Sequence, residues 1–463
     1  MDLAAKDKKY VWHPFTQMKD WAKEDILVIE RGEGSYLIDT QGRRYLDGVS
    51  SLWCNVHGHQ VPEIDQAIED QLGKIAHTTF LGLTHPSAIL LAEKLVKLNP
   101  GLSRVFYSDS GSEAVEIALK MAFQYWQHRG LRKKSKFVRL KHAYHGDTIG
   151  AVSVGGMDLF HEIFHPLLFK CFEAPSPYVY RWPKGGPPVK VRDGALSALE
   201  SILKKNHREI AALIMEPLIQ GAAGMITQPK GYISAVRKLT RRYNVLLIFD
   251  EVATGFGRTG TMFAYEQERA VPDLLTLAKG LTGGYLPLAA TLASEEIYKA
   301  FLGNYKEFKA FFHGHTFTAN PLACRAAIAS LELFEKRGLL DLIQKRIAQT
   351  QKRWAAFKEL SIVGDIRQAG LMIGIELVQN QKTKQSFDLK EQIGVQVIRR
   401  ARAKGLILRP LGSVIVLMPV LSMSEEEVEK LLDITYESIK ETNDSLSVFR
   451  RRGSVLRRKS LRL

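Results

Sequence analysis

The chain has 463 residues, of which 45% are hydrophobic and 25% charged, and it carries a formal net charge of +16. This composition is typical of a globular α/β protein with more than one domain and excludes a fibrous or largely disordered chain. No apolar run approaches the roughly 20 residues of a membrane-spanning helix, and the first residues lack a secretory signal pattern, so we expect a cytoplasmic protein without a membrane partner.

In chain order, residues 1–61 include a turn-rich stretch, Glu30–Gly48, and are expected to join a smaller domain. Residues 62–330 alternate between helical and strand patterns, with apolar strands predicted within "RVFYSDS", "KFVRL", "AALIMEP", "VLLIFDE" and "LPLAATLA". Runs that are apolar on both faces favour a parallel sheet covered by helices. We therefore predict a large α/β domain over 62–330 and a smaller α+β domain over 331–445.

The end of the chain is strongly basic. Phe449–Leu463 carries seven Lys or Arg residues and no acid. We predict that residues 446–463 form a disordered, solvated tail and expect no nucleic-acid partner. The alternative is a non-catalytic binder whose tail contacts nucleic acid, but that reading leaves the polar groups described next without a purpose.

An acidic pair, Asp250 and Glu251, follows a strand of apolar residues. P-loop hydrolases have a similar acidic strand, but the G-x-x-x-x-G-K-[ST] string that they need is absent from this sequence. Lys279 follows another apolar run, 29 residues after Asp250. Because ligands bind at the carboxyl ends of strands in open α/β sheets, we expect Asp250 and Lys279 to meet there. A desolvated lysine favours amine chemistry, although Asp250 could instead be a buried structural carboxylate.

Two further elements add to this pattern. A strand-to-helix turn holds Ser108, Ser110, Gly111 and Ser112, whose N–H groups could bind a phosphate or simply cap the helix. Tyr144 lies in a loop of small residues and could stack on a flat ring or pack in the core. A phosphate cradle, a carboxylate, an isolated lysine and a stacking aromatic ring together indicate a site for pyridoxal 5′-phosphate (PLP).

Three motifs, "LIFDEVATGFGRTG", "LAKGLTGGYLP" and "FHGHTFTANPLAC", resemble the class III aminotransferases of PLP fold type I, and the resemblance spans about residues 10 to 440. It implies a mostly parallel sheet of the seven-stranded type in the large domain and a homodimer with shared active sites. Three further stretches resemble those of the aminotransferases in biotin biosynthesis that convert 8-amino-7-oxononanoate to 7,8-diaminononanoate: "WHPFTQMKDW", "SLWCNVHGH" and "YHGDTIGAVSVG". Another class III transaminase of ω-amino acids is the alternative.

The resemblance also implies roles for residues around the cofactor. Lys279 becomes the Schiff-base lysine and the base for the proton shift, and Asp250 binds the pyridine nitrogen. Gly111 and Ser112 hold the phosphate. The remaining cofactor residues implied by the family are Tyr144, stacked on the ring, Glu216, in the hydrogen-bond network, and His315 and Thr316, which reach the phosphate of the neighbouring subunit.

On the substrate side, the resemblance implies contacts with the amino donor and acceptor. Arg409 is expected to receive the substrate carboxylate as a bidentate partner. Arg258 resembles an active-site arginine of the family but could equally be structural. The other implied substrate contacts are Phe15, Trp53, Gly314, and the cofactor residues Tyr144 and Lys279.

The amino donor stays open between S-adenosylmethionine and L-lysine. Family members that use S-adenosylmethionine typically have Tyr in an "HPYT" motif where this chain has Phe15. We predict no metal site, because the pairs His57/His59 and His313/His315 lie in glycine turns without a matching set of Cys or acidic residues. The three cysteines are scattered and are expected to be reduced.

Overall fold

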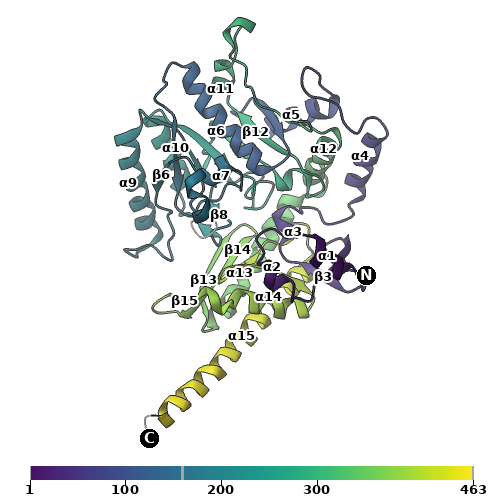
Figure 1. The fold of residues 1–463 in the computed structure, drawn as a ribbon, viewed down its shortest axis with the longest axis vertical. Coiled ribbons are helices and arrows are strands. Elements are labelled where there is room, and N and C mark those ends of the chain that lie inside the picture. Colours follow the sequence, from purple (N-terminus) through teal and green to yellow (C-terminus); the bar gives the residue numbers. More distant parts are fainter. Residues whose placement is uncertain (1, 158–160, 461–463) are drawn as a thin grey trace.

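The computed structural model describes residues 2–157 and 161–460, and it describes side chains as far as residue 446. A large sheet with its covering helices forms one part of the molecule, and a second group of smaller sheets lies beside it (Figure 1). Among the described residues, no helix combines the length and apolar character needed to cross a membrane.

The large sheet has seven strands in the order β4-β12-β11-β10-β7-β5-β6. Only β12 runs antiparallel to its neighbours β4 and β11, so the predicted mostly parallel α/β sheet is confirmed. β7 and β10 are buried along their whole length, as expected for apolar runs covered on both faces. The strands are β4 Arg104–Ser108, β5 Lys136–Leu140, β6 Phe172–Ala174, β7 Ile210–Met215, β10 Leu246–Asp250, β11 Leu274–Leu277 and β12 Ala289–Ala293.

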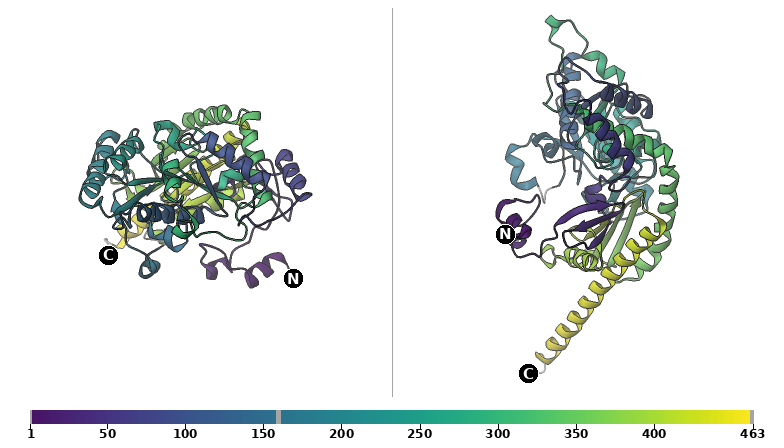
Figure 2. Two further views of the ribbon diagram at one scale, coloured as in Figure 1. Left: turned by 90° about the horizontal axis from the view of Figure 1, so that it is seen from above. Right: turned by 90° about the vertical axis from the view of Figure 1, so that its right-hand side faces the viewer.

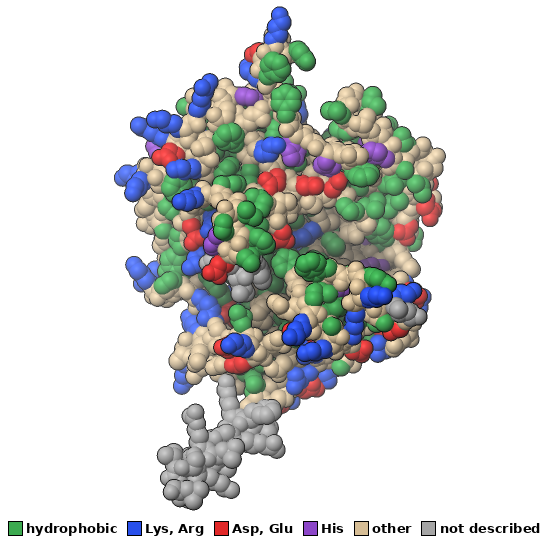
Figure 3. All heavy atoms as spheres, in the orientation of Figure 1, with side chains coloured by type: hydrophobic (Ala, Val, Ile, Leu, Met, Phe, Trp, Pro, Cys, Tyr) green, Lys and Arg blue, Asp and Glu red, His purple; other side chains and the backbone are tan. Residues whose placement is uncertain are grey.

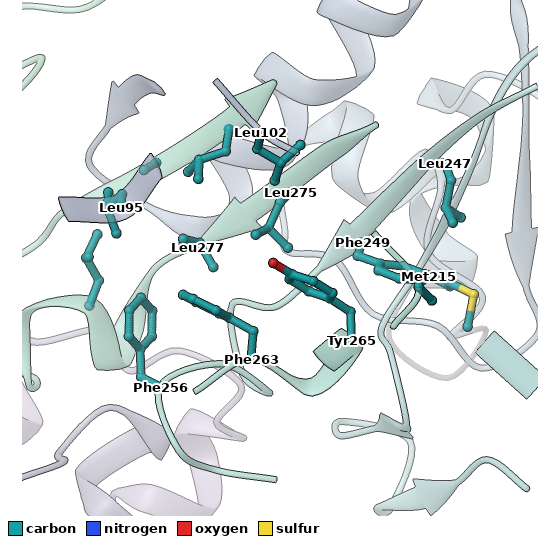
Figure 4. Packing of buried hydrophobic residues seen from close by; sticks show 14 of the residues in the cluster. Leu95, Leu102, Met215, Leu247, Phe249, Phe256, Phe263, Tyr265, Leu275 and Leu277 are labelled. Carbon is teal, nitrogen blue, oxygen red and sulfur yellow. The ribbon is translucent and has the colours of Figure 1, made fainter. Parts of the chain in front are cut away.

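Alternate residues of each strand face opposite layers of helices. In β10, Leu246 and Ile248 pack with α6, whereas Leu247 and Phe249 face the layer that includes α9 and α10. The second layer continues into a cluster of aromatic side chains under the sheet, drawn in Figure 4. The covering helices are α4 Pro62–Leu72, α5 Pro86–Leu98, α6 Gly111–His128, α7 Ile149–Ser153, α9 Pro188–Asn206, α10 Tyr232–Arg242, α11 Glu295–Ala300 and α12 Pro321–Lys336.

The smaller sheets combine both ends of the chain. β16 pairs in parallel with β3, and Leu46 of β3 belongs to the same hydrophobic cluster as β14 and β18. The N-terminal strands are therefore held by the C-terminal part. The strands are β1 Ile29–Glu33, β2 Tyr36–Asp39, β3 Arg44–Asp47, β13 Val363–Ala369, β14 Met372–Asn380, β15 Gln385–Ser386, β16 Leu406–Ile407, β17 Arg409–Leu411 and β18 Val414–Leu417.

A two-stranded hairpin, β8 Ile219–Gln220 and β9 Ile226–Thr227, follows β7. The remaining helices are α1 Leu3–Tyr10, α2 Met18–Trp21, α3 Ser50–Trp53, α13 Leu339–Glu359, α14 Ile393–Ala403, η1 Glu162–Leu167, η2 Ala264–Glu268, η3 Lys279–Thr282, η4 Tyr305–Glu307 and η5 Leu389–Glu391.

The last helix, α15 Glu425–Ser460, runs into the stretch 446–463 that the sequence predicts to be a disordered tail. It projects from the body of the protein, and its backbone stays helical through most of the stretch predicted to be a disordered tail (Figure 2). The buried face that includes Val428, Leu431 and Leu432 anchors the first turns, and extending a formed helix costs far less than starting one. Residues 461–463, the end of the predicted tail, lie outside the described residues.

Candidate active site

A cavity of about 560 Å³ lies where several strands of the large sheet end. Asp109 and Ser110 follow β4, Asp250 ends β10 and Lys279 follows β11, so the cavity lies at the carboxyl edge of the sheet. It brings together nine of the residues singled out from the sequence, namely Phe15, Trp53, Gly111, Ser112, Tyr144, Glu216, Asp250, Lys279 and Arg409.

Asp250 is 4% exposed and has three polar partners within hydrogen-bond distance, which leaves one acceptor position of its carboxylate open. Its Oδ2 lies 2.7 Å from Nδ1 of His145, and its Oδ1 accepts from the backbone N–H of Val252 at 3.0 Å and from the Thr276 hydroxyl at 3.3 Å. A buried charge needs such partners to remain ionised. His145 was not among the residues predicted from the sequence, although it stands directly after Tyr144.

Lys279 follows the neighbouring strand β11 as the first residue of η3, close enough to Asp250 to feel its charge. β10 and β11 pair in parallel with Asp250 beside Thr276, three residues before Lys279. The Lys279 Nζ lies 5.0 Å from the centre of the Trp53 ring. Desolvation lowers the pKa of Lys279, and the nearby carboxylates Asp250 and Glu216 partly oppose this effect. The lysine is therefore poised to offer a neutral amine.

The turn before α6 leaves two backbone donors open. Ser110 caps the helix by accepting from the Glu113 N–H at 3.3 Å, and the Glu113 carboxylate accepts from the Ser110 N–H at 3.0 Å. In the described chain, the N–H groups of Gly111 and Ser112 have no hydrogen-bond partner. A Cβ at Gly111 would come within 2.7 Å of Val252, so this position requires glycine.

Glu216 lies just after β7 and connects two loops of the cavity. Its carboxylate accepts from the N–H of Gly221 at 2.8 Å and of Tyr144 at 3.3 Å. Burial raises the pKa of Glu216 to about 7, against a smaller opposing effect of His145. The Tyr144 hydroxyl donates to Asp147 at 2.8 Å, and burial raises the pKa of that hydroxyl.

Three cavity residues have a backbone conformation that is rare for residues other than glycine. The φ angles are 50° at Phe15, 67° at Trp53 and 48° at Lys279. Such strain costs on the order of 1–3 kcal/mol per residue and is typical of functional sites. Arg409, at the start of β17, brings a half-buried guanidinium to the same cavity from the smaller sheets.

Four of the predicted residues lie outside the cavity. Arg258 is 2% exposed, and its guanidinium donates to Ser50 Oγ at 2.7 Å, to the carbonyl oxygen of Asn55 at 2.8 Å and to that of Pro419. It therefore joins three segments of the chain, and its contact with a substrate stays a prediction.

The other three, Gly314, His315 and Thr316, lie together in the loop before α12. His315 Nδ1 lies 3.3 Å from the carboxylate of Asp109, which does line the cavity. Gly314 and Thr316 are exposed.

The residues present fit PLP. Two unpartnered N–H groups at the start of an 18-residue helix suit a phosphate. A buried carboxylate at Asp250 suits a protonated ring nitrogen, and the amine of Lys279 suits an aldehyde carbon. Each of these groups lines the same cavity.

Comparisons with known proteins agree with this chemistry. The family Aminotransferase class-III matches residues 18–439. Adenosylmethionine-8-amino-7-oxononanoate aminotransferase of Anoxybacillus flavithermus is 54% identical over 95% of this chain and 96% of its own. The enzyme of that name from Geobacter sulfurreducens is 51% identical over 94% of this chain and 96% of its own.

Solved structures give the same result. The crystal structure of adenosylmethionine-8-amino-7-oxononanoate aminotransferase from Methanocaldococcus jannaschii superposes with a TM-score of 0.90 at 49% identity, covering 95% of this chain and 98% of that one. An (S)-enantioselective omega-transaminase from Thermomicrobium roseum superposes with a TM-score of 0.91 at 34% identity, covering 95% of this chain and 98% of that one. The chain belongs to the class III aminotransferases, PLP-dependent enzymes of fold type I.

Proposed function

We propose that this aminotransferase converts 8-amino-7-oxononanoate to 7,8-diaminononanoate in biotin biosynthesis. The observation that carries the proposal is the near-complete match, at 54% and 51% identity, to enzymes named for that substrate. The cavity supports it, because Arg409 provides a cation for the substrate carboxylate in the same space as the Lys279 amine.

When bound, PLP supplies an electron sink for a carbanion next to nitrogen. We propose that Lys279 Nζ would hold the cofactor through its aldehyde carbon until the donor amine takes over that bond. The freed Nζ would then accept the proton from the donor carbon and deliver it to the carbon that had carried the aldehyde. Asp250 Oδ holds a proton on the ring nitrogen, and His145 keeps that carboxylate in position through its 2.7 Å contact. This kind of fixed electrostatic environment commonly contributes several kcal/mol to catalysis.

The remaining cavity residues bind and orient. The N–H groups of Gly111 and Ser112 receive the phosphate, and Tyr144 packs on the ring. Glu216 holds the Tyr144 loop through the backbone N–H of that residue. Trp53 and Phe15 form the apolar wall of the substrate pocket.

Two amino donors have specific support. S-adenosylmethionine is in the names of the relatives. L-lysine is favoured by Phe15, because this side chain lines the cavity without the hydroxyl of the tyrosine typical of users of S-adenosylmethionine.

The two donors can be told apart with purified protein loaded with PLP. Each candidate donor, including ornithine as a control for other class III substrates, is added alone while the cofactor absorbance is followed. 8-Amino-7-oxononanoate is then added and 7,8-diaminononanoate is measured by mass spectrometry. We expect product with one of the two proposed donors. Turnover with ornithine and no product from the oxo acid would reject the proposed substrate.

Lys279→Ala tests the central assignment. We expect this variant to lose turnover completely, while Lys299→Ala, on the exposed face of α11, keeps the activity of the unaltered protein. Deleting residues 447–463 should leave activity unchanged, since the described residues that line the cavity all lie at or before Leu411. Activity in Lys279→Ala above the background without enzyme contradicts the role of the lysine.

We also propose a homodimer with shared active sites. His315 and Thr316 lie outside the cavity of their own chain, and large apolar side chains are exposed in the same loop and nearby, with Leu81 at 90%, Phe312 at 73% and Phe317 at 53%. Exposed apolar surface of this extent is typical of an interface. A partner chain would bury these residues and bring Thr316 to the phosphate of the other cavity.

Mixing two inactive variants tests this sharing. Lys279→Ala and a Thr316 variant that cannot bind the phosphate each lack one part of the site. If Thr316 serves the neighbouring cavity, heterodimers regain one complete site and the mixture recovers about a quarter of full activity. A mixture that stays as inactive as its components, with heterodimers present by mass spectrometry, refutes the sharing.

We further propose that residues 1–61 and 331–445 act as one smaller domain and residues 62–330 as the cofactor-binding domain. The pairing of β3 with β16 and the hydrophobic cluster shared by both ends of the chain support this division.

A further inference from the structure

A second and larger groove, of about 1210 Å³, lies between the large sheet and the smaller sheets. One wall is the irregular segment 175–187 and the first turns of α9, and the other is formed by β14, β18 and the residues around β15. It contains neither Lys279 nor Asp250, so it is a space separate from the catalytic cavity.

The walls of the groove are largely apolar. Trp182 packs across Gly194 of α9, where an added Cβ would lie 3.0 Å from the indole ring. Val189, on the same helix, is 56% exposed, and Phe387 faces the groove from the smaller sheets. A surface of this kind suits the flat or aliphatic body of a small molecule.

The charges around these walls are unbalanced. Lys141, Lys184 and Lys190 line the groove, and their ammonium groups have no hydrogen bond or ion pair within the described chain. Figure 3 shows Lys and Arg side chains gathered along the edge of the molecule where α9 lies. These cations lack an anion.

The two acids that line the groove do not supply that anion. Asp193 already accepts from Arg192 Nε at 2.9 Å. Glu376 is buried and paired with Arg367 and Arg181. Burial acts to raise the pKa of Glu376, but these two cations outweigh it and leave the pKa below the ordinary value. Both negative charges are therefore neutralised, and the three lysines set the charge that a ligand would meet.

Three short segments each contribute residues to both the groove and the catalytic cavity. Lys141 and His142 line the groove while Tyr144 lines the catalytic cavity. In the second segment, Ala223 lines the groove and Ala222 lines the catalytic cavity.

The third segment is the β17–β18 hairpin. Its residues Arg409 and Leu411 line the catalytic cavity, and Ser413 and Val414 line the groove. An occupant of the groove would press on the segments that hold Tyr144 and Arg409.

We propose that this groove is a binding site for a small amphipathic anion, with an apolar body between Trp182 and Phe387 and its carboxylate, sulfonate or phosphate among Lys141, Lys184 and Lys190, and that its occupancy changes the affinity of the catalytic cavity. This goes beyond the transamination itself and does not depend on which donor or acceptor the enzyme uses.

The binding test uses 8-anilinonaphthalene-1-sulfonate as the probe and its uncharged parent, N-phenyl-1-naphthylamine, as the matched ligand. The PLP-loaded enzyme is compared with Lys184→Glu/Lys190→Glu and with the control Lys204→Glu/Lys205→Glu, which reverses two exposed charges at the other end of α9. At low salt we expect the groove variant to bind the sulfonate about tenfold more weakly, and the control variant to bind it as the unaltered enzyme does.

The uncharged probe should bind all three proteins equally. Equal loss of sulfonate affinity in both double variants would show a general charge effect and overturn the proposal. Unchanged sulfonate binding in the groove variant would overturn it as well. Circular dichroism of each variant confirms that it is folded before binding is compared.

The coupling is tested separately, through the KM for the amino acceptor at saturating sulfonate probe. We expect this KM to change at least about threefold in the unaltered enzyme and in Lys204→Glu/Lys205→Glu, and to stay constant in Lys184→Glu/Lys190→Glu. An equal change in all three proteins would mean that the probe acts inside the catalytic cavity, which contradicts the coupling. No change in any of them also contradicts it.

Discussion

Replacing Arg409 by alanine should weaken use of the oxo acid far more than use of an analogue without its carboxylate. The Arg409 guanidinium is half-buried at the cavity wall and has no acidic partner within the described chain, so it is available to a ligand. A fork-to-fork contact with a carboxylate makes two charge-assisted hydrogen bonds, each worth about 1.5–3 kcal/mol. Water replaces part of this at a half-exposed site, which leaves about 2–4 kcal/mol.

At 1.4 kcal/mol per factor of ten, this loss corresponds to a fall of roughly 30- to 700-fold in kcat/KM for 8-amino-7-oxononanoate. Arg409→Lys keeps the charge but loses the planar fork, so its effect should be intermediate. Arg402→Ala, an exposed arginine in the same part of the chain, is the control and should change nothing.

The assay compares kcat/KM for the oxo acid with that for its amide, in which a neutral carboxamide replaces the carboxylate. The unaltered enzyme should prefer the acid, and Arg409→Ala should lose most of that preference. If the variant loses the same factor on both acceptors, Arg409 does not read the carboxylate and the reasoning from its open guanidinium is refuted.

Three other substitutions test the site and its support. Gly111→Ala places a Cβ within 2.7 Å of Val252 and should weaken PLP binding at least about tenfold in a fluorescence titration, whereas Gly73→Ala has room and should not. Burial raises the pKa of Glu216 from 4.5 to about 7 in the folded protein, so its protonated carboxyl contributes to the stability of the fold. This contribution is fully present below about pH 4.5 and is lost as the pH rises through 7. Denaturant titrations should therefore show that, between pH 5 and pH 8.5, the free energy of unfolding falls by about 2–3 kcal/mol less in Glu216→Gln than in the unaltered protein. Parallel pH profiles of the two proteins would contradict this. Lys134 donates to three backbone carbonyl oxygens at 2.5–3.0 Å, so Lys134→Met should lower the free energy of unfolding by about 2–4 kcal/mol in urea, and a loss below 1 kcal/mol would contradict a structural role for these bonds.

The large sheet could be predicted because its strands are short apolar runs separated by helix patterns. The carboxyl edge as a ligand site followed from the same pattern, and the structure places Asp250 and Lys279 in one cavity there. The strand-to-helix turn at Ser110 was also predicted as a phosphate site or helix cap, and the structure adds the capping box with Glu113 that leaves the next N–H groups open. These features depend on neighbours close in the sequence.

Features that depend on distant segments could not be predicted. Arg258 donates to Ser50 and Pro419, which are 208 and 161 residues away in the chain. No local pattern shows that the arginine of a glycine-rich loop will meet those distant groups. His145 was missed for the same reason, because a histidine in a loop gives no sign that it will face a carboxylate 105 residues later.

The two acids at the end of β10 show how one short stretch serves two purposes. Because side chains alternate along a strand, Asp250 and its neighbour Glu251 leave the sheet in opposite directions. Asp250 meets His145 and the cavity, whereas Glu251 accepts from the N–H groups of Ala264 at 2.8 Å and Tyr265 at 2.9 Å.

Burial raises the pKa of Glu251 to about 8, so this carboxyl is costly to ionise. It contributes to the stability of the fold by holding η2 beneath the sheet. Asp250, by contrast, faces the cavity, where its carboxylate contacts His145 and the Thr276 hydroxyl. An isosteric Glu251→Gln variant should therefore alter stability and leave the cofactor spectrum unchanged, while Asp250→Asn should alter the spectrum. If both substitutions changed the spectrum equally, the division of labour between neighbouring acids would be wrong.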